Sequence, residues 1–483
     1  MQESTSFFAL LLEWTHLLDR IFWGPPMLIL LLGIGIYLTI RGRGIQFRSL
    51  GESLRITFFS KEARSTQKEG DISPLAALMT ALAATVGNGN IAGVGTAIAI
   101  GGPGAPVFMW LAGIFGMATK YAEGYLGVRF RERLPNGSLA GGPMYYLKNG
   151  LENKKLGRVL GIIYAACGVT ACLIGSGNMT QSNSMTASLA QSIHIWSGGS
   201  LSETAPTWLY FLIGGLIAIS VGIVILRGIR SIGSVAEKLV PTMIFFYFFF
   251  ALWIVISHWD GIGEAFSLIF RSAFGWQALG GAVVGDAVRR GISQGCLSSE
   301  AGLGSAAIAQ AASSSDDPRK NGLIAMTGVF IDTLLANTLT TLVIVLTGAY
   351  MHTEAWAGAG TPDLKSGILV TQEAFSSVFP QIGGTVIALA SFLFGYTTLL
   401  GWAYYGEKCI EFLGGQAIIR PFRIAFIAFL FLGAVLTPLA GESYQFINII
   451  WNLGNIGNAL MAAPNLIGLL LLGGIVFGAS QRK

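Results

Sequence analysis

The stretch that decides the fold runs from Thr80 to Gly101 and reads TALAATVGNGNIAGVGTAIAIG. It is long and apolar enough to cross a bilayer, yet Gly87-Asn88-Gly89-Asn90 stands in its middle. Glycine weakens a helix by about 1 kcal/mol relative to alanine. Backbone groups opened at membrane depth are tolerated only beside protein or a water-filled cavity. The stretch therefore predicts an interrupted membrane helix whose freed N–H and C=O groups bind a ligand.

The composition places the chain among polytopic helical membrane proteins. Of its 483 residues, 53% are hydrophobic, 11% are charged and 65 are glycine, whereas an average soluble domain carries about 25% charged residues. Apolar stretches of spanning length recur along the whole chain, and no long polar segment separates them. A large soluble domain is therefore excluded. The formal net charge of +5 lies mainly in short loops, which favours a role in membrane topology over nucleic-acid binding.

Basic loops fix the expected orientation of the spans. Loops 41–68 and 129–158 are rich in Lys and Arg, so the positive-inside rule makes them cytoplasmic and places the N-terminus outside. The outer segment 351–380 is long enough for a short lid helix at about 365–377. We expect about twelve spans, which leaves the C-terminal basic pair outside against the rule, or eleven if the last two form one bent element. The expected spans are 24–40, 72–101, 105–129, 159–190, 207–226, 239–257, 275–290, 323–349, 383–406, 422–438, 444–461 and 465–479.

A second interrupted helix is expected in the other half of the chain. It begins near Gly275, contains Leu279-Gly-Gly-Ala-Val-Val-Gly285 and re-enters the cytoplasm at Arg289 and Arg290, before a Gly/Ser/Ala-rich loop at 291–320. The second interrupted span is the fifth after the first, an odd number, so the two halves insert with opposite orientation, as in inverted-repeat secondary transporters. The predicted organisation is an N-terminus, leading helix and basic loop at 1–70, five-helix repeats at 71–260 and 261–462, and a trailing helix at 463–483.

The first interruption offers two kinds of binding site. The outer half-helix begins near Asn90, and its N-terminal amides carry the positive end of the helix dipole, which suits a carboxylate. The inner half-helix ends near Val86, and its last carbonyls suit a bare cation. The alternative is that Gly89 and Gly93 serve only close packing between helices.

The span at 159–190 contains a run that is too polar to face lipid. This run is Ser176-Gly-Asn-Met-Thr-Gln-Ser-Asn-Ser184, and Asn178, Gln181 and Ser182 in it share one helix face. These side chains either reach a ligand or form hydrogen bonds between helices. Gln181, with the longest reach, is the stronger candidate for a ligand contact.

The span at 383–406 offers hydroxyl groups and a large aromatic ring. Thr397 and Thr398 are adjacent, and their hydroxyls suit the oxygen shell of a small hard cation. The alternative for each is a hydrogen bond to its own helix, four residues back. Trp402 lies one turn beyond Thr398 and either walls a pocket or fills the core.

The charged residues in or near spans are expected at cytoplasmic ends. They form salt bridges or a gate there, or else a proton relay. No CxxC pair, Walker A motif, metal motif or catalytic triad is present in the sequence, which disfavours an enzyme. The charged residues are Lys120, Glu123, Asp286, Glu407 and Lys408.

These features resemble the alanine/glycine:cation symporter family. The similarity runs from about residue 70 to 466 and implies the inverted-repeat fold of the leucine-transporter type. That fold has ten core helices, so span 24–40 is an additional leading helix. Ser299 stands where the family usually has Asn, which leaves the exact substrate open. The matching stretches are Gly70-Asp-Ile-Ser-Pro, Val86-Gly-Asn-Gly-Asn-Ile-Ala-Gly-Val, Lys120-Tyr-Ala-Glu, Gly141-Gly-Pro-Met-Tyr-Tyr, Ser299-Glu-Ala-Gly-Leu-Gly-Ser305, Tyr404-Tyr-Gly-Glu and Met461-Ala-Ala-Pro-Asn-Leu.

The resemblance implies roles for individual residues. Backbone N–H groups of Asn88 and Gly89 bind the substrate carboxylate, and Trp402 restricts the pocket to small side chains. The substrate site as a whole consists of Asn88, Gly89, Gln181, Gly280, Gly281 and Trp402. The sodium site consists of carbonyls of Ala83, Val86 and Phe394 with the hydroxyls of Thr397 and Thr398, and a less favoured second position of Thr85 and Asn90.

The function implied is sodium-coupled import of alanine and glycine by alternating access. Sodium is then a co-transported ion, no organic cofactor is needed, and the protein resides in the inner (plasma) membrane of the cell. The partners are a small neutral amino acid and the lipid bilayer, with no nucleic acid and no obligate protein partner. Two alternatives stay open: a proton-coupled amino-acid transporter of the same fold, with Glu123 or Asp286 titrating, and a channel or sensor.

Overall fold

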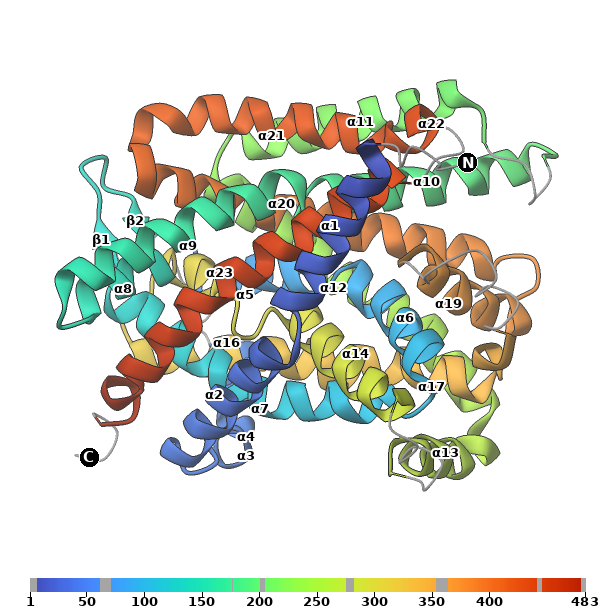
Figure 1. The fold of residues 1–483 in the computed structure, drawn as a ribbon, viewed down its shortest axis with the longest axis horizontal. Helices are drawn as coiled ribbons and strands as arrows, with labels where there is room; N and C mark the ends of the chain where they lie inside the picture. The colour runs from blue at the N-terminus through green and yellow to red at the C-terminus, as the bar shows by residue number, and fades with distance from the viewer. Residues whose placement is uncertain are drawn as a thin grey trace.

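The computed structural model describes residues 7–60, 71–175, 177–199, 205–274, 282–352, 364–440 and 445–478. In these ranges the chain is helical apart from one small antiparallel ribbon, in which β1 (Glu132–Arg133) pairs with β2 (Leu139–Ala140). Figure 1 shows the helices running roughly side by side, with the ribbon at one end and α13 (Ile262–Phe274) and α19 (Leu364–Val378) at the other.

Two long helices begin the described chain, before the first interrupted helix. They are α1 (Phe7–Phe22) and α2 (Pro25–Arg41), which together match the expected leading span and extend it toward the N-terminus. Pro25 is tolerated at the first position of α2, because the N–H that it lacks would have no partner inside the helix. Two shorter helices, α3 (Ile45–Arg48) and α4 (Leu50–Phe59), follow in the basic loop.

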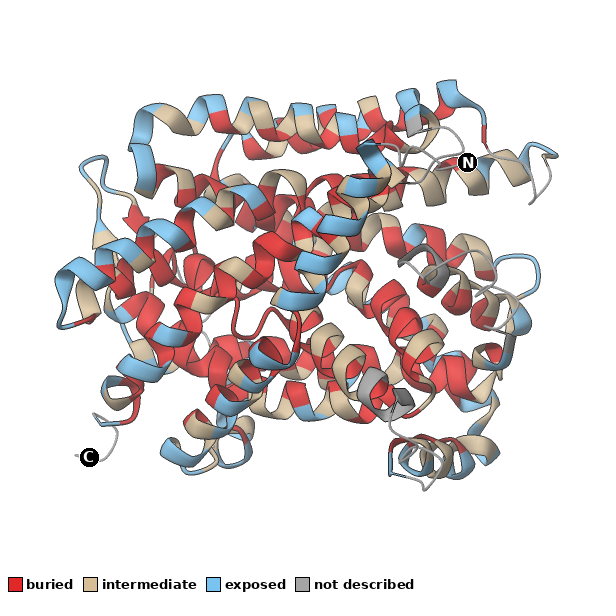
Figure 2. Cartoon of the chain, in the orientation of Figure 1, coloured by how far each residue is buried: buried red, intermediate tan, exposed pale blue. Residues whose placement is uncertain are grey.

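The stretch from Thr80 to Gly101 is interrupted where the sequence predicts. Helix α5 (Pro74–Thr85) ends before the short turn η2 (Asn88–Asn90), and α6 (Ala92–Gly101) continues at an angle of 55°. Ser73 caps α5 by accepting a hydrogen bond from the N–H of Ala76 at 3.0 Å. Both half-helices lie in the buried centre of the bundle (Figure 2).

The next helices complete the first half of the bundle. The expected span at 159–190 is confirmed as a span from Lys154 to Trp196, but the helix in it is interrupted around Gly175 and Gly177. A Cβ on Gly175 would lie 2.7 Å from the Cα of Gly454, and one on Gly177 would lie 2.6 Å from the Trp402 ring. Glycine is therefore needed at both positions, because the backbone lies in close contact with Gly454 on one side and with Trp402 on the other. The helices are α7 (Ala105–Arg129), α8 (Pro143–Gly150), α9 (Lys154–Ile174), α10 (Met179–Trp196), α11 (Thr207–Ile225) and α12 (Ile229–Ser257).

The second interrupted helix exists, but the break that the structure describes lies after the predicted stretch 279–285, of which 279–281 are outside the described residues. Helix α14 (Ala282–Ser299) passes through 282–285 and both arginines without a break, and α15 (Ser305–Ala311) follows after residues 300–304. The predicted loop at 291–320 is therefore largely helix. Gly302 and Gly304 have φ values of 94° and 76°, which glycine adopts without strain. The predicted substrate residues Gly280 and Gly281 lie outside the described residues.

The second half of the bundle ends with one long helix instead of two. Helix α23 passes through Pro464, so the last two expected spans form one element, whereas the expected total of eleven or twelve spans is not reached, because the described residues contain eight or nine. The C-terminal end of α23 then lies at the same end of the molecule as the β1–β2 ribbon, while the N-terminal end of α1 lies at the other (Figure 1). The remaining elements are α16 (Pro318–Val329), the π-helical η4 (Phe330–Asn337), α17 (Thr338–Leu346), η5 (Ala349–His352), α20 (Gly383–Gly414), η6 (Gln416–Ile418), α21 (Ile419–Ala434), α22 (Leu436–Ala440) and α23 (Gln445–Gly478).

The predicted lid helix forms as α19 and packs directly on α6. A Cβ on Gly95 of α6 would lie 2.1 Å from the carbonyl oxygen of Gly367 in α19, so the two backbones touch. The Thr371 hydroxyl of α19 donates to the Ile91 carbonyl at 3.0 Å. The lid helix is thus attached to the first interruption itself.

The described helices have the composition of a membrane bundle. Eight are long and apolar enough to cross a bilayer, and the bent pair of α5 with η2 and α6 makes nine. Outer helices such as α11 and α12 expose apolar side chains, including Ile219 and Phe245, whereas α5, α6 and α20 are mostly buried (Figure 2). This pattern is the reverse of a soluble protein and fits a surface that faces lipid.

Candidate functional site

A cavity of about 390 Å³ reaches the first interruption from one end of the bundle. Its deep part is lined by Gly87, Asn88 and Gly89, and its outer part by residues of α10 and of the lid helix α19, such as Gln191 and Gln372. The second interruption, α20 and α23 supply the other walls. The cavity therefore connects both helix interruptions with the end of the molecule that carries α19.

The backbone of the first interruption is only partly used by the protein. Gly87 N–H donates to the Asn90 side-chain oxygen at 2.9 Å, and Asn90 N–H donates to the Gly87 carbonyl at 3.0 Å. In the described part of the chain, the N–H groups of Asn88 and Gly89 donate no hydrogen bond. These two donors lie at the cavity and at the start of a helix, where an anion is stabilised.

The Asn88 side chain links two helices across the cavity. Its amide nitrogen donates to Gln181 of α10 at 3.0 Å, and its oxygen accepts a hydrogen bond from the Ser391 hydroxyl of α20 at 2.8 Å. Gln181 uses its oxygen in this contact, so its NH₂ group is what it offers to a ligand. Asn88 and Gln181, predicted separately from the sequence, are thus direct partners.

The other polar residues of the 176–184 run divide by role. Gln181 and Ser184 line the cavity. Asn178 and Ser182 are completely buried and bond to protein, Asn178 to the Phe426 carbonyl at 3.0 Å and Ser182 to the Met179 carbonyl at 3.1 Å. Asn178 therefore follows the alternative of a hydrogen bond between helices, whereas Ser182 bonds within its own helix α10.

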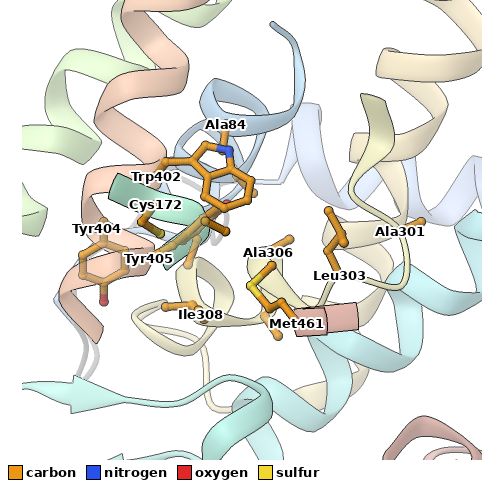
Figure 3. Close-up of a cluster of buried hydrophobic side chains, with 14 of the residues drawn as sticks. Ala84, Cys172, Ala301, Leu303, Ala306, Ile308, Trp402, Tyr404, Tyr405 and Met461 are labelled. Atoms are coloured by element: carbon orange, nitrogen blue, oxygen red, sulfur yellow. The ribbon is translucent and has the colours of Figure 1, made fainter. Parts of the chain in front are cut away.

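Trp402 forms a wall of the cavity and packs tightly on one side. Its ring lies against Gly177, next to Ala84 of α5, and makes an edge contact with Tyr405 at 5.8 Å between ring centres (Figure 3). Gly401 allows this arrangement, because a Cβ there would lie 2.7 Å from the Cβ of Ala84. The ring is 2% exposed and is fixed by these contacts, so it limits the size of any ligand.

The predicted cation residues lie around one edge of the first interruption. The Phe394 carbonyl accepts hydrogen bonds from the hydroxyls of Thr398 at 2.8 Å and Thr397 at 3.0 Å. The Thr398 oxygen also faces Gly87, where a Cβ would lie 2.7 Å from it. Both hydroxyls bond to their own helix, yet a hydroxyl that donates keeps lone pairs with which to bind a cation. Ala83 and Val86, at the end of α5, are buried.

Thr397 and Thr398 face different neighbours. Thr398 lines the cavity, whereas the Thr397 hydroxyl contacts the Met243 sulfur of α12 at 3.2 Å. The structure therefore brings Thr398, the Phe394 carbonyl and the first interruption together, and it directs Thr397 toward α12.

Asn90 belongs to a buried polar cluster that the sequence did not reveal. Its amide nitrogen donates to Asp332 at 2.7 Å and to Asn337 at 2.9 Å, and Asp332 also accepts a hydrogen bond from the Ser298 hydroxyl at 3.0 Å. Asp332 lies in the π-helical segment η4 and is completely buried. A carboxylate inside the apolar span 323–349 is the signal that would have found it. Thr85 bonds to the Ala81 carbonyl of its own helix at 3.2 Å and lines the cavity.

Lys120 and Glu123 of α7 hold the second interruption in place. One oxygen of Glu123 accepts hydrogen bonds from the N–H groups of Gly302 at 2.9 Å and Gly304 at 3.0 Å. The Lys120 ammonium donates to the Ser299 carbonyl at 2.9 Å. Both charges are buried at this interruption, and within the described residues neither forms the salt bridge that one alternative predicted.

The other charged residues singled out from the sequence form ion pairs. Glu407 pairs with Arg423 of α21 at 2.7 Å, and Lys408 pairs with Glu411 at 2.7 Å. These pairs correspond to the salt-bridge alternative. The side chain of Asp286 lies outside the described residues.

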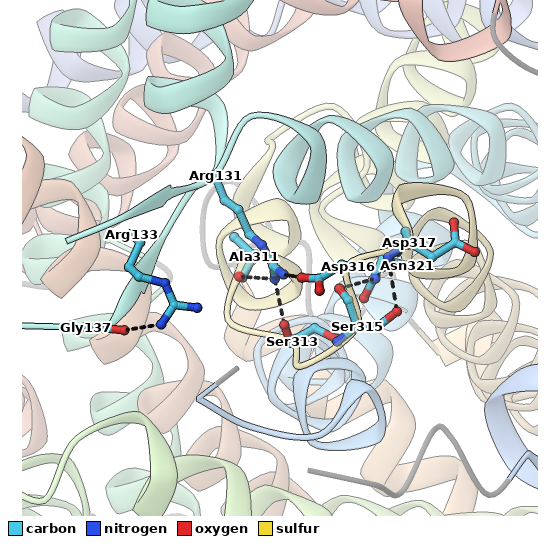
Figure 4. Close-up of polar contacts among 9 residues, drawn as sticks. All are labelled: Arg131, Arg133, Gly137, Ala311, Ser313, Ser315, Asp316, Asp317 and Asn321. Carbon is cyan, nitrogen blue, oxygen red and sulfur yellow. Dashed lines mark hydrogen bonds and ion pairs between the residues drawn. The ribbon is translucent and has the colours of Figure 1, made fainter. Parts of the chain in front are cut away.

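The end of the bundle opposite α19 is closed by backbone contacts. Ile72, just before α5, pairs with Ser313, just after α15, in a short parallel bridge. Arg131 donates to the carbonyls of Ala311 at 3.0 Å and Ser313 at 2.6 Å, and it forms an ion pair with Asp316 (Figure 4). The inner parts of both interrupted helices are thereby tied together.

Comparison with known proteins gives consistent results across the whole chain. The sodium/alanine symporter AgcS of Methanococcus maripaludis is 43% identical over 459 residues, which is 95% of this chain and 94% of AgcS. The probable sodium/glutamine symporter GlnT of Bacillus subtilis is 32% identical over 463 residues, covering 95% of this chain and 88% of GlnT.

A solved structure shares the fold at low sequence identity. MhsT, crystallised in complex with L-phenylalanine, aligns with 85% of this chain and 98% of its own, with a TM-score of 0.56 and 17% identity. This likeness confirms the predicted fold of the leucine-transporter type. The model of the sodium:alanine symporter family matches residues 9–482. The chain therefore belongs to the sodium:alanine symporter family.

Proposed function

We propose that this protein imports alanine and glycine together with sodium across the plasma membrane. Membership of the sodium:alanine symporter family makes the protein a secondary transporter and not an enzyme. The transported amino acid, the coupling ion and the membrane are our proposals for this chain. AgcS, which is 43% identical to this chain, is named a sodium/alanine symporter. This name supports alanine as the transported amino acid and sodium as the coupling ion.

One observation carries the proposal: the N–H groups of Asn88 and Gly89, which donate no hydrogen bond within the described residues, lie at the cavity. They suit the carboxylate that every amino acid carries. The Gln181 NH₂ group is the next donor, since its oxygen is taken by Asn88. A small neutral side chain then points toward Trp402, whose fixed ring leaves little room.

The proposed sodium site lies on the other side of the same interruption. Thr398, the Phe394 carbonyl and the end of α5 meet there, and all of them offer oxygen ligands. Thr397 is a weaker member of this site, because its hydroxyl also contacts Met243. Sodium that joins α5 to α20 favours one arrangement of the two helices, and coupling requires that substrate binds best to that arrangement.

The arrangement of the cavity supports alternating access. It is open toward the end with α19, which the positive-inside rule places outside, and Arg131 and the Ile72–Ser313 bridge close the opposite end. Release of the substrate inside the cell requires the opposite state of the cavity, in which the end at α19 is closed and α5 is separated from α15. The five-helix repeats at 71–260 and 261–462 are our proposal for the units that move.

Uptake by proteoliposomes tests this function. Purified protein is reconstituted, and radiolabelled alanine and glycine are supplied with an inward sodium gradient or with equal sodium, at constant pH. The proposal predicts accumulation only with the sodium gradient. Uptake that follows a pH gradient and ignores sodium would support the proton-coupled alternative, and flux without saturation would support a channel.

A further inference from the structure

Glu300, at the start of the second interruption, has no part in the site proposed so far. It lines the cavity, although only 2% of the residue is exposed. Its φ of 52° lies in the left-handed region, which only Arg43 shares among the non-glycine residues that the structure describes. Glycine adopts this conformation freely, whereas Glu is strained in it. The strained backbone thus holds a carboxylate at the cavity wall.

The neighbours of this carboxylate fix its position without neutralising it by direct contact. It accepts a hydrogen bond from the Ser305 hydroxyl, and the Trp402 side chain is close enough to act on it electrostatically. The Lys120 ammonium is close enough to act on it electrostatically, but its hydrogen bond goes to the Ser299 carbonyl. A buried carboxylate with a neutral hydrogen-bond partner is well suited to bind a cationic group that enters the cavity.

Backbone acceptors at the second interruption are largely used by the protein. The Ser299 carbonyl accepts from Lys120, and the Glu300 carbonyl accepts from the N–H of Leu303 at 3.2 Å. The Gly302 carbonyl accepts from Asn465 at 2.8 Å, and the Leu303 carbonyl accepts from the Tyr164 hydroxyl at 3.1 Å. An ammonium group needs acceptors for its three donors, and the Glu300 carboxylate adds a charged side-chain acceptor to this wall.

The two interruptions are close enough to share one small ligand. A Cβ on Gly89 would lie 3.6 Å from the Cα of Ser298, only two residues before Glu300. Anion donors on the first interruption and a carboxylate on the second thus line the same cavity. An α-amino acid carries an anionic and a cationic group on one carbon, and it matches this pair of sites.

We infer that the Glu300 carboxylate binds the α-ammonium group of the transported amino acid, opposite the carboxylate site at Asn88 and Gly89. The inference rests on the proposed amino-acid substrate and goes beyond it, because it assigns the group that separates amino acids from other small acids. Trp402, which lies close to Glu300, then limits the side chain of the ligand. Lactate has a hydroxyl in place of the ammonium and loses the charged contact.

The test compares alanine with L-lactate as ligands of the Glu300→Gln variant. Gln keeps the shape and an acceptor oxygen but removes the negative charge. Binding to purified protein in detergent with sodium is measured by calorimetry, so that the result does not depend on transport. We expect alanine to bind about tenfold more weakly or worse, while lactate changes less than about twofold. Glu152→Gln, at an exposed loop residue, is the matched control and leaves both ligands unchanged.

Glu300→Asp separates charge from shape. It keeps the charge in the same strained backbone with a shorter side chain, so its affinity for alanine lies between those of the wild type and Glu300→Gln. Equal weakening of alanine and lactate in Glu300→Gln, or unchanged alanine binding, would overturn the inference. A wild-type protein that binds no amino acid would instead overturn the proposed function. Thermal unfolding of each variant shows whether a loss of both ligands comes from misfolding. If Glu300→Gln is misfolded, the affinity of Glu300→Asp for alanine tests the inference instead.

Discussion

Single side chains connect the helices around the cavity. Asn88 donates to Gln181 of α10 and accepts from Ser391 of α20, so one amide joins the first interruption to two other helices. The sequence does not reveal these side-chain contacts, because the partners lie 93 and 303 residues away in the chain. Thr398 and Thr397 show the opposite case: adjacent in sequence, they face different neighbours.

The two threonines predict different effects on sodium dependence. Replacing Thr398 with Ala removes an oxygen that faces Gly87. A hydrogen bond or ligand contact to a charged group contributes about 1.5–3 kcal/mol. We therefore expect the sodium concentration for half-maximal uptake to rise about tenfold or more. Thr397→Ala, with its hydroxyl near Met243, is the comparison and should change this concentration less. Equal effects of the two substitutions would place both hydroxyls at the cation, and normal sodium dependence of Thr398→Ala would remove it from the site.

Trp402 predicts a change in substrate size. Replacing it with Ala removes a buried ring from the cavity wall, which makes room for a larger aliphatic side chain. Uptake of leucine should appear, while glycine uptake falls because the smallest ligand loses the wall that Trp402 provides. Competition of unlabelled leucine against labelled alanine measures this change. Trp253→Ala, on an exposed face of α12, is the control, and unchanged selectivity in Trp402→Ala would make Trp402 a packing residue only.

At the scale of helices, the two interruptions differ in what the sequence reveals. The first is visible because two glycines and two amides stand together in an apolar span. The second was placed at 279–285, where glycines cluster, but the helix is interrupted at 300–304. Its position depends on Glu123 and Lys120 of α7, which bind the opened backbone from far away in sequence. A tertiary contact of this kind outweighs the local helix propensity, so no pattern in the nearby sequence marks the position of the interruption.

The rest of the fold was predictable for physical reasons. Long apolar spans and basic loops gave most helices and the lid at 364–378, because the bilayer fixes helix length and charge placement. The break at Gly175 was missed because it serves close contacts with Gly454 and Trp402, which are distant in sequence. Asp332 and Glu300 were missed as functional candidates, because only the folded chain shows that their carboxylates lie beside the two interruptions.

The first interruption predicts the effect of a single methyl group. In Gly87→Ala the new Cβ would lie 2.7 Å from the Thr398 oxygen, so the two helices must move apart. We expect sodium-driven uptake to fall strongly while the protein still folds, because the φ of Gly87 (−137°) suits any residue. Gly33→Ala, in α2, is the matched control, since nothing lies within 4 Å of its new Cβ. Normal sodium-driven uptake by Gly87→Ala would contradict the close approach.

The contacts at the closed end predict a local change in backbone stability. Arg131→Gln removes the ion pair with Asp316 and weakens the hold on the carbonyls after α15 (Figure 4). Amide hydrogen exchange at residues 71–73 and 311–316 should become about tenfold faster, which corresponds to a loss of about 1.4 kcal/mol. Arg133→Gln, on the neighbouring ribbon, is the control. Unchanged exchange in Arg131→Gln would mean that the backbone bridge closes this end without the arginine.

At the scale of the whole molecule, the arrangement is that of one state of a transport cycle. The cavity is open on the side of α19 and closed on the side of the β1–β2 ribbon. Both interrupted helices contribute to the cavity, and their inner parts are tied together by the Ile72–Ser313 bridge. In our proposal, a ligand that bridges the two interruptions and a sodium ion that joins α5 to α20 act on the same moving parts. This shared position is the physical basis for coupling their fluxes.

Coupling is reciprocal, so an alanine gradient must also drive sodium. The most direct measurement uses proteoliposomes with equal sodium and equal pH on both sides, an inward alanine gradient and radioactive sodium as tracer, with the membrane potential clamped at zero. Our account predicts that sodium accumulates inside above equilibrium only when alanine is supplied, and that the internal pH stays constant. Alanine entry without sodium accumulation, or with acidification of the interior, would contradict it.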